Sequence, residues 1–296
     1  MNFLALILGL AVERLLTQLF HLRKFHWLDP VFDLAFSKLK NISQIAAPAA
    51  TLGIVLLLIL PIGLMEFSLQ DQLAQIPLFA FAVLVLLFCL GPRDLAEEIN
   101  DYRIALSDND QQEMAKLSRE FLEAGAESES PAEIEAAIYA QANNRVFAVV
   151  FWFFLLGPTG AWMFRVLDLM RRRAIHHSEL HAANGGDDLP PLVRGTLVLH
   201  RLAAWIPARL LMAGYMLAGS YDGAVAGWRE QPEPTTELFP GPDDQRLGFV
   251  GRGAAPESEA DDIATRAEIA LKLVRRTLWM IWCPALAVLT LYGWIN

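Results

Sequence analysis

The chain has 296 residues, a net charge of -9 and 19% charged residues, and its mean hydropathy is +0.34. A soluble domain carries about 25% charged residues and a nucleic-acid-binding protein presents a basic face, so the composition argues against both classes. The two cysteines, Cys89 and Cys283, lie in apolar stretches without metal-ligand spacing. We expect them to pack as small apolar side chains.

Long stretches without any charged residue dominate the chain. A helix needs about 20 residues to cross a membrane, and four charge-free stretches reach or approach this length: Ile45–Met65, Gln72–Pro92, Val146–Phe164 and Thr277–Asn296. Two more stretches are long enough but contain charged residues. Phe3–Phe20 contains Glu13 and Arg14, and Leu202–Tyr221 contains Arg209. The sequence therefore predicts an all-α, polytopic helical membrane protein.

Lysine and arginine residues indicate the side of the membrane on which each loop lies, because they resist translocation. Five of them lie in Arg14–Gln44 and five in Arg93–Arg145, whereas Glu66–Asp71 has none. We therefore place Arg14–Gln44 and Arg93–Arg145 in the cytoplasm and Glu66–Asp71 outside. Arg93–Arg145 also holds thirteen Asp and Glu residues, and its apolar spacing predicts cytoplasmic helices, one of which begins at Pro131.

The stretch Val146–Phe164 does not fit a simple crossing. Gly157 and Pro158 lie near its middle, and proline removes a backbone donor and clashes with the preceding turn. A full crossing would also place Arg171-Arg172-Arg173 outside, against the usual distribution of positive charge. We predict a broken helix that dips into the membrane and returns to the same side.

The prediction for the whole chain is about four full spans, one or two broken or re-entrant apolar segments and cytoplasmic helices. Leu202–Tyr221, which contains Pro207, is the second broken candidate. Two full crossings with Arg165–Arg201 outside remain open. The expected divisions are residues 1–92 (three spans and a basic loop), 93–145 (acidic helices), 146–221 (broken apolar segments), 222–262 (a mobile Pro/Gly-rich loop) and 263–296 (a final helix and span).

Several polar residues lie within or beside these apolar segments and are candidate ligand-binding residues. A charge at the bilayer centre costs about 2.5–3.5 kcal/mol on insertion scales, so Glu13 and Arg14 either face a protein interior or lie at the cytoplasmic boundary. Asn143, Asn144 and Arg145 form a polar cluster before the broken segment, either as a binding site or as a helix end among headgroups.

Arg209 and Asp168 are the other candidates. An arginine in an apolar segment needs a carboxylate or phosphate partner, and we predict that Arg209 faces Glu13, Asn144 or Asp168 around a pocket open to the cytoplasm. The alternative is that it reaches lipid headgroups. Asp168 follows Arg165 by three residues, a spacing that also fits a simple ion pair on one helix.

His177 and His181 are four residues apart, a spacing that can share a metal ion on a helix. No HExxH motif accompanies them, and a solvated segment beside the membrane explains them better. We predict no metal centre, and the sequence does not indicate a cofactor.

A set of short motifs resembles the AmpE family of membrane proteins linked to β-lactamase induction. The motifs are Val12-Glu13-Arg14-Leu15, His26-Trp27-Leu28-Asp29, Asn144-Arg145-Val146-Phe147, Phe151-Trp152-Phe153, Gly157-Pro158 and Trp205-Ile206-Pro207-Ala208-Arg209-Leu210. The order and spacing of these motifs also resemble, more distantly, the cobinamide amide synthases of cobalamin assembly. The shared elements are Pro207-Ala208-Arg209-Leu210 and Leu167-Asp168.

This chain differs from the synthases at positions that would be needed for their enzymatic activity. Where those enzymes carry acidic residues, this chain has Asn143 and Phe147, and His200-Arg201 stands where they carry paired aspartates. Carboxylates there would hold Mg²⁺ or act as a base. The resemblance thus implies a regulatory protein of the bacterial inner membrane, involved in cell-wall stress and β-lactam resistance, rather than a synthase.

Three functions stay open at this point: a regulatory or sensory protein that binds a wall-derived or phosphate-bearing small ligand, a membrane-embedded synthetase-like enzyme, and a transporter. The lipid bilayer is the partner that the apolar segments require, and the net charge argues against nucleic acid as a partner. The sequence leaves a homodimer open.

Overall fold

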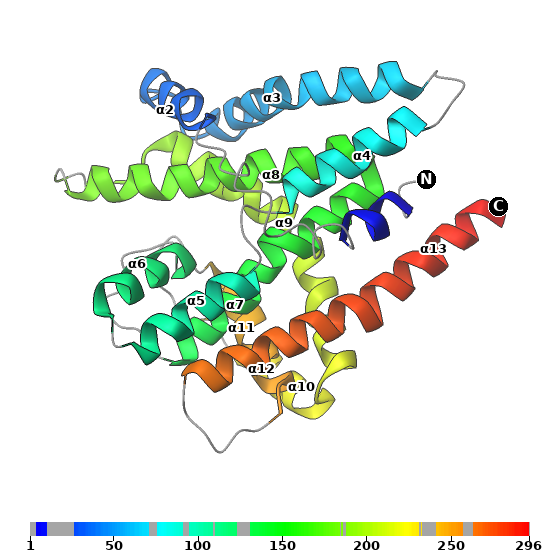
Figure 1. The fold of residues 1–296 in the computed structure, drawn as a ribbon. Helices are drawn as coiled ribbons and strands as arrows, with labels where there is room; N and C mark the ends of the chain where they lie inside the picture. Colours follow the sequence, from blue (N-terminus) through cyan, green and yellow to red (C-terminus); the bar gives the residue numbers. More distant parts are fainter. Residues whose placement is uncertain are drawn as a thin grey trace. The chain divides into compact units, whose positions relative to one another are not determined.

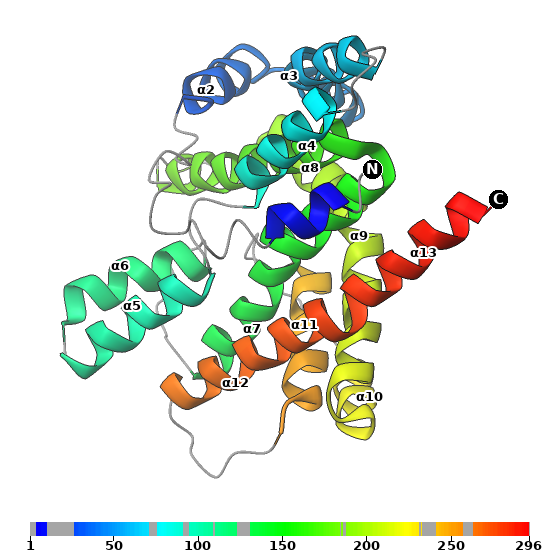
Figure 2. The same cartoon turned by 45° about the vertical axis from the view of Figure 1, so that its right-hand side comes forward.

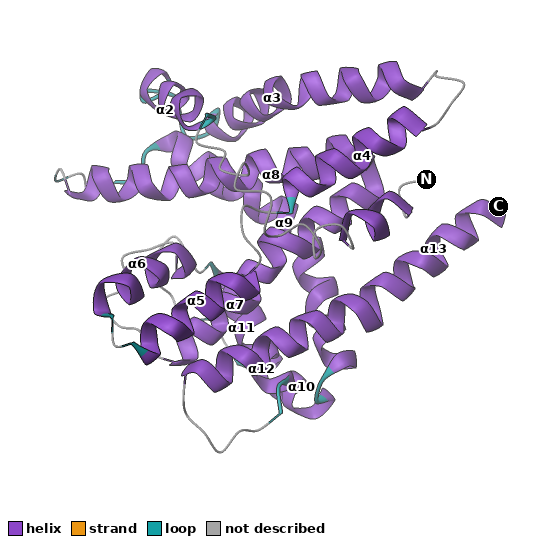
Figure 3. Ribbon diagram, viewed as in Figure 1, coloured by secondary structure: helices purple, strands orange, loops and turns teal. Residues whose placement is uncertain are grey.

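The computed structural model describes residues 4–10, 27–70, 76–90, 95–108, 110–122, 131–183, 185, 188–230, 232, 241–256 and 263–295. Residues 4–10 are helical. The further elements are α2 Asp29–Lys38, α3 Ala47–Gln70, α4 Ile76–Cys89, α5 Leu95–Ser107, α6 Gln111–Leu122, α7 Pro131–Ala142, the π-helical turn η2 Asn143–Phe147, α8 Ala148–Ala183, α9 Pro191–Ala218, α10 Tyr221–Arg229, α11 Pro242–Ala254, α12 Ile263–Arg276, the π-helical turn η3 Thr277–Trp282 and α13 Cys283–Ile295. The described residues contain no strand (Figure 3).

The helices confirm an all-α membrane protein. Among the described residues, four helices are long and apolar enough to cross a membrane: Ala47–Leu69, Glu133–Ala183, Pro191–Ala218 and Ile263–Tyr292. Helix α4, within the predicted span Gln72–Pro92, has 14 residues, which measures about 21 Å at 1.5 Å per residue.

The chain forms two compact units, residues 1–92 with 148–204 and residues 93–147 with 205–296. In the first unit, α2, α3 and α4 pack against α8, and α3 runs beside α8 (Figure 1). Gly195 of α9 lies against the backbone of Ala47, so that a Cβ atom there would be 2.7 Å from the Ala47 carbonyl carbon. The absence of a side chain at Gly195 therefore lets α9 approach α3 closely.

Helix α8 breaks at Gly157, as the sequence predicts. Gly157 has φ 65° and ψ -156°, outside the helical region, and Pro158 follows it. A Cβ atom on Gly160 would lie 2.3 Å from the carbonyl oxygen of Trp152, eight residues earlier. In a straight helix residues eight apart are separated by about 12 Å, so the chain turns back sharply here.

Helix α9 is continuous through Pro207, the site of the second predicted break. A proline leaves the carbonyl four residues earlier without its helical partner, and that carbonyl belongs to Ala203. The indole N–H of Trp152 donates to the Ala203 oxygen at 3.0 Å. A side chain from α8 thus replaces the missing backbone bond and lets the helix continue.

In the second unit, α7, α11 and α12 pack together and α10 lies along α11 (Figure 2). The sequence predicts a loop over residues 222–262, but α10 and α11 are helical there. Pro242 occupies the start of α11, with Asp243 and Asp244 in its first turn, a favourable helix beginning. Glycines allow the backbones of α10 and α11 to touch, as between Gly223 and Gly253.

Candidate functional site

The depth of the charged residues on α8 follows from its contacts with α3. The backbone N–H of Thr159 donates to Glu66 at 3.1 Å, and the Trp162 indole donates to the carbonyl of Leu58 at 3.0 Å. From Thr159 to Asp168 the helix rises about 13 Å, whereas α3 measures about 28 Å from Glu66 back to Ala47. Asp168 therefore lies level with the middle of α3, an apolar segment that is long enough to cross a membrane.

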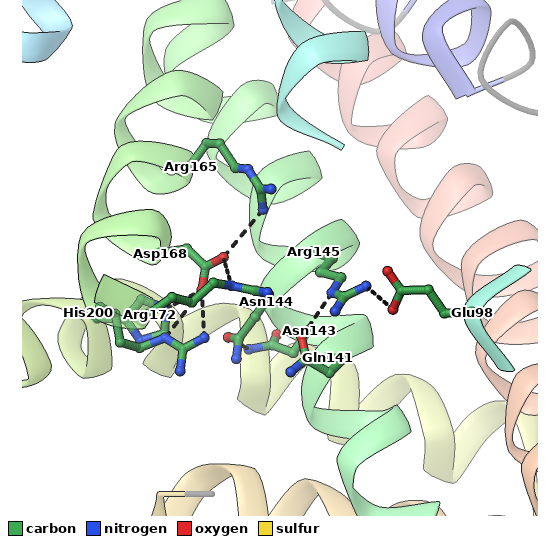
Figure 4. A network of polar contacts seen from close by, with 10 residues as sticks. Glu98, Gln141, Asn143, Asn144, Arg145, Arg165, Asp168, Arg172 and His200 are labelled. Atoms are coloured by element: carbon green, nitrogen blue, oxygen red, sulfur yellow. Dashed lines mark hydrogen bonds and ion pairs between the residues drawn. The ribbon is translucent and has the colours of Figure 1, made fainter. Parts of the chain in front are cut away.

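Three arginines converge on Asp168 at this level, and we call these four residues the arginine cluster. Nη1 of Arg165 donates to Oδ2 of Asp168 at 3.3 Å, and Nη2 of Arg171 donates to Oδ1 at 2.8 Å. Nε of Arg172 donates to Oδ2 at 3.1 Å (Figure 4). Arg165, Asp168 and Arg171 are buried, and the Arg172 side chain is 25% exposed.

His200 of α9 extends the arginine cluster. Its Nε2 lies 3.6 Å from Oδ1 of Asp168, and its ring stacks at a tilt on Phe164 with a centroid separation of 5.5 Å. His200 is thus a fifth polar group beside the same carboxylate. The arrangement is rich in donors, and donors of this kind bind phosphate and carboxylate groups.

A separate polar group lies in the second unit around η2. Arg145 donates through Nη1 to Glu98 at 2.6 Å and through Nε to Gln141 at 3.0 Å (Figure 4). Both side chains of the Arg145–Glu98 pair are buried. Asn143 and Asn144 are buried beside them, and Nδ2 of Asn143 donates to Oδ1 of Asn144 at 3.5 Å. The opposite charges of Arg145 and Glu98 compensate each other inside the protein.

Arg209 is held within the second unit by a partner that the sequence did not indicate. Its Nη2 lies 2.7 Å from Oδ1 of Asp243 in the first turn of α11. The guanidinium also lies over the rings of Trp205 and Trp228, at 5.6 and 5.2 Å from their centroids. The side chain is 23% exposed, so Arg209 is paired with Asp243 and partly shielded from solvent. The sequence predicted Glu13, Asn144 or Asp168 as its partner, and of these Glu13 lies outside the described residues.

Helix α2 is tied to α8 by an ionic contact. Nε and Nη2 of Arg173 each donate to Asp33 at 2.6 Å, and Nε2 of His177 lies 2.8 Å from the same carboxylate. The hydrogen bond from Arg173 lowers the pKa of Asp33 to about 2. His177 therefore contacts a carboxylate, and the described residues hold no group of three or more potential metal ligands.

The sequence predicted part of this arrangement. Glu13 and Arg14 lie outside the described residues, and the Arg165–Asp168 ion pair that the sequence spacing fits is present. Sequence reasoning did not find Glu98, Asp33 or Asp243, because each joins its partner from another helix. The spacing of Arg171 and Arg172 from Asp168 matches ion pairs on one helix, a signal in the sequence that could have identified both as its partners.

These features define a polytopic helical membrane protein with buried charged groups on its apolar helices. The family model of the regulatory signalling modulator protein AmpE matches residues 1–295, so the chain belongs to the AmpE family. The resemblance that the sequence motifs indicated is thereby confirmed.

The chain is also similar to a protein of cobalamin assembly. It is 28% identical over 276 residues to the cobalamin biosynthesis protein CobD of Chromobacterium violaceum, a match that covers 82% of this chain and 80% of that protein. No solved structure matches the chain.

Proposed function

We propose that this chain is a regulatory protein of the bacterial inner membrane that adjusts β-lactamase induction in response to cell-wall stress. It recognises an anionic ligand, bearing a phosphate or carboxylate group, at the arginine cluster, which opens to the cytoplasm. The observation that carries the proposal is the convergence of Arg165, Arg171 and Arg172 on the buried carboxylate of Asp168.

The local charge supports an anion as the ligand. Residues 158–177 include four arginines and one acidic residue. Placing a charged side chain inside a membrane is energetically unfavourable unless the charge is paired or hydrated. Charged residues at such positions therefore often have a function. Guanidinium groups bind phosphate and carboxylate oxygens with two parallel hydrogen bonds. Asp168 holds three such groups close together, so an entering anion meets several donors at once.

The broken helix supports entry from one side. The chain reverses at Gly157, and the residues on either side of the break, Val146–Phe164, carry no charge. Irregular backbone at membrane depth is tolerated where it is covered by protein or faces a water-filled cavity. A hairpin that re-enters the membrane from the cytoplasm would place Arg171 and Arg172 on the arm that leads back to the cytoplasm, the side from which a soluble ligand arrives.

Induction in cells tests the proposal. A strain without its own copy is complemented with Arg172→Lys or with Arg201→Lys, an exposed arginine on α9 that serves as the control. Lysine keeps the charge and loses the forked contact. Arg172→Lys should change the β-lactamase level after β-lactam exposure several-fold at equal protein abundance, whereas Arg201→Lys should match the wild type. Equal induction in both strains contradicts the proposal.

A membrane-embedded enzyme is the second candidate, favoured by the similarity to CobD over four-fifths of that protein. Against it, Asn143 and Phe147 stand where the synthases carry the carboxylates that would hold a metal ion, and Glu98 is already bound to Arg145. Complementation of a strain that lacks its cobalamin biosynthesis protein separates the two functions. Growth that requires cobalamin synthesis supports the enzyme, and failure to grow at normal protein abundance rejects it.

A further inference from the structure

The two asparagines of η2 carry hydrogen-bonding capacity that the described residues do not use. Oδ1 of Asn143 and Nδ2 of Asn144 are buried and have no hydrogen-bond partner among the described residues. The whole side chains are 1% and 0% exposed. Leaving a buried donor or acceptor without a hydrogen bond destabilises the folded state, so a partner for this pair is strongly favoured.

The unused groups form a complementary pair. Nδ2 of Asn143 donates to Oδ1 of Asn144, which leaves one carbonyl oxygen and one NH₂ group on neighbouring side chains. Turning both amides over exchanges the two roles and again leaves one acceptor and one donor group. A ligand that matches them must offer a donor beside an acceptor, as a carboxamide or a peptide group does.

The electrostatics of η2 disfavour a charged ligand. Arg145, the charged residue of this turn, is bound to Glu98 at 2.6 Å and to Gln141 at 3.0 Å. An additional charge would disturb a buried ion pair that is already compensated, and burying an unpaired charge is costly. An uncharged amide adds no charge and satisfies both asparagines.

The backbone around the asparagines is unusual as well. π-Helical turns are rare and occur frequently at functional sites. The described part of this unit contains two, η2 and η3, and they touch where the ring of Phe147 meets the ring of Trp282 with centroids 5.0 Å apart. Aromatic rings beside a hydrogen-bonding pair suit an amide attached to a small apolar group.

We propose that Asn143 and Asn144 form a binding site for an uncharged amide group of a small ligand, distinct from the arginine cluster. The ligand's amide N–H donates to one asparagine and its carbonyl accepts from the other. Because both side chains are buried, the ligand reaches them only when the surrounding helices separate, so binding is coupled to a conformational change of this unit.

Ligand-observed saturation-transfer NMR on the full chain in lipid nanodiscs tests the site. The probe is propionamide, and the comparison compounds are N,N-dimethylpropionamide, which lacks the donor, and propionate, which is charged. Propionamide should give a saturable signal that falls at least tenfold in Asn143→Leu/Asn144→Leu. The two comparison compounds should give no more than this residual signal. Asn100→Leu, an exposed asparagine on α5, should leave the propionamide signal unchanged.

Thermal unfolding shows whether the variants are folded. Replacing two unsatisfied polar groups by apolar ones should leave the melting temperature equal or higher. If the double leucine variant does not fold, Asn144→Ser removes the amide with a smaller side chain and should also abolish the signal. The proposal is overturned if propionamide gives no saturable signal, if N,N-dimethylpropionamide binds equally well, or if the folded variants bind like the wild type.

Discussion

The indole N–H of Trp152 donates a hydrogen bond of 3.0 Å to the carbonyl of Ala203, four residues before Pro207. This bond replaces the one that the proline cannot make. Trp152→Phe keeps the ring and leaves the Ala203 carbonyl without its donor, which should destabilise the protein by about 1–3 kcal/mol. Denaturation of the purified chain in detergent measures the change. Trp279→Phe, at an exposed position, should cost much less, and equal losses would contradict this role for Trp152.

The close packing of α10 on α11 depends on glycine. A Cβ atom on Gly227 would lie 2.2 Å from the carbonyl oxygen of Phe249, which is backbone and cannot move aside alone. Gly227→Ala should therefore destabilise the chain by about 1–3 kcal/mol. Gly53→Ala is the matched control, because nothing lies within 4 Å of a Cβ atom there. Comparable melting temperatures for both variants would show that α10 and α11 do not pack this closely.

Because Asp33 contacts Arg173 and His177, the free energy of unfolding of the protein should depend on pH. The pKa of Asp33 is lowered from 3.8 to about 2, so its contribution is present above the ordinary value and is lost as the pH falls through about 2. The carboxylate is 37% exposed, and solvent screening reduces the contribution to about 1 kcal/mol. Asp33→Asn should lower stability at pH 6 by this amount and have no effect near pH 1.5. A pH-independent difference would contradict the ion pair.

The proposal that the hairpin re-enters the membrane predicts that the two ends of residues 146–164 share one side of the membrane. Single cysteines at Asp108 and Glu179, both exposed, can be tested with a membrane-impermeant maleimide in spheroplasts. Neither should react until the membrane is permeabilised, and the native Cys89 and Cys283 are buried and contribute little. Reaction at one position alone before permeabilisation would mean that the segment crosses the membrane.

The sequence predicted the features that depend on nearby residues. The lengths of the apolar stretches indicated membrane helices, Gly157-Pro158 indicated a break, and the three-residue spacing from Arg165 to Asp168 indicated an ion pair. Each of these follows from local geometry. Helix α11 was missed because its glycines resemble a loop signal until the partner backbone that requires them is known.

The partners of the candidate residues depend on tertiary contacts. Arg209 and Asp243 are 34 residues apart, and Glu98 and Arg145 are 47 apart. The continuity of α9 through Pro207 likewise depends on Trp152, 51 residues before Ala203. No periodicity within a single helix encodes these pairings, so the sequence identified the charged residues without their partners.

Anion binding to the purified protein tests the arginine cluster most directly. The melting temperature of the wild type in nanodiscs is measured against rising inorganic phosphate, with sodium chloride at matched ionic strength as the reference. A ligand that binds the folded state raises the melting temperature with its concentration. We predict a saturable rise that is lost in Arg172→Lys and kept in Arg201→Lys. No rise, or the same rise in Arg172→Lys as in the wild type, would contradict anion recognition at Asp168 and its arginines.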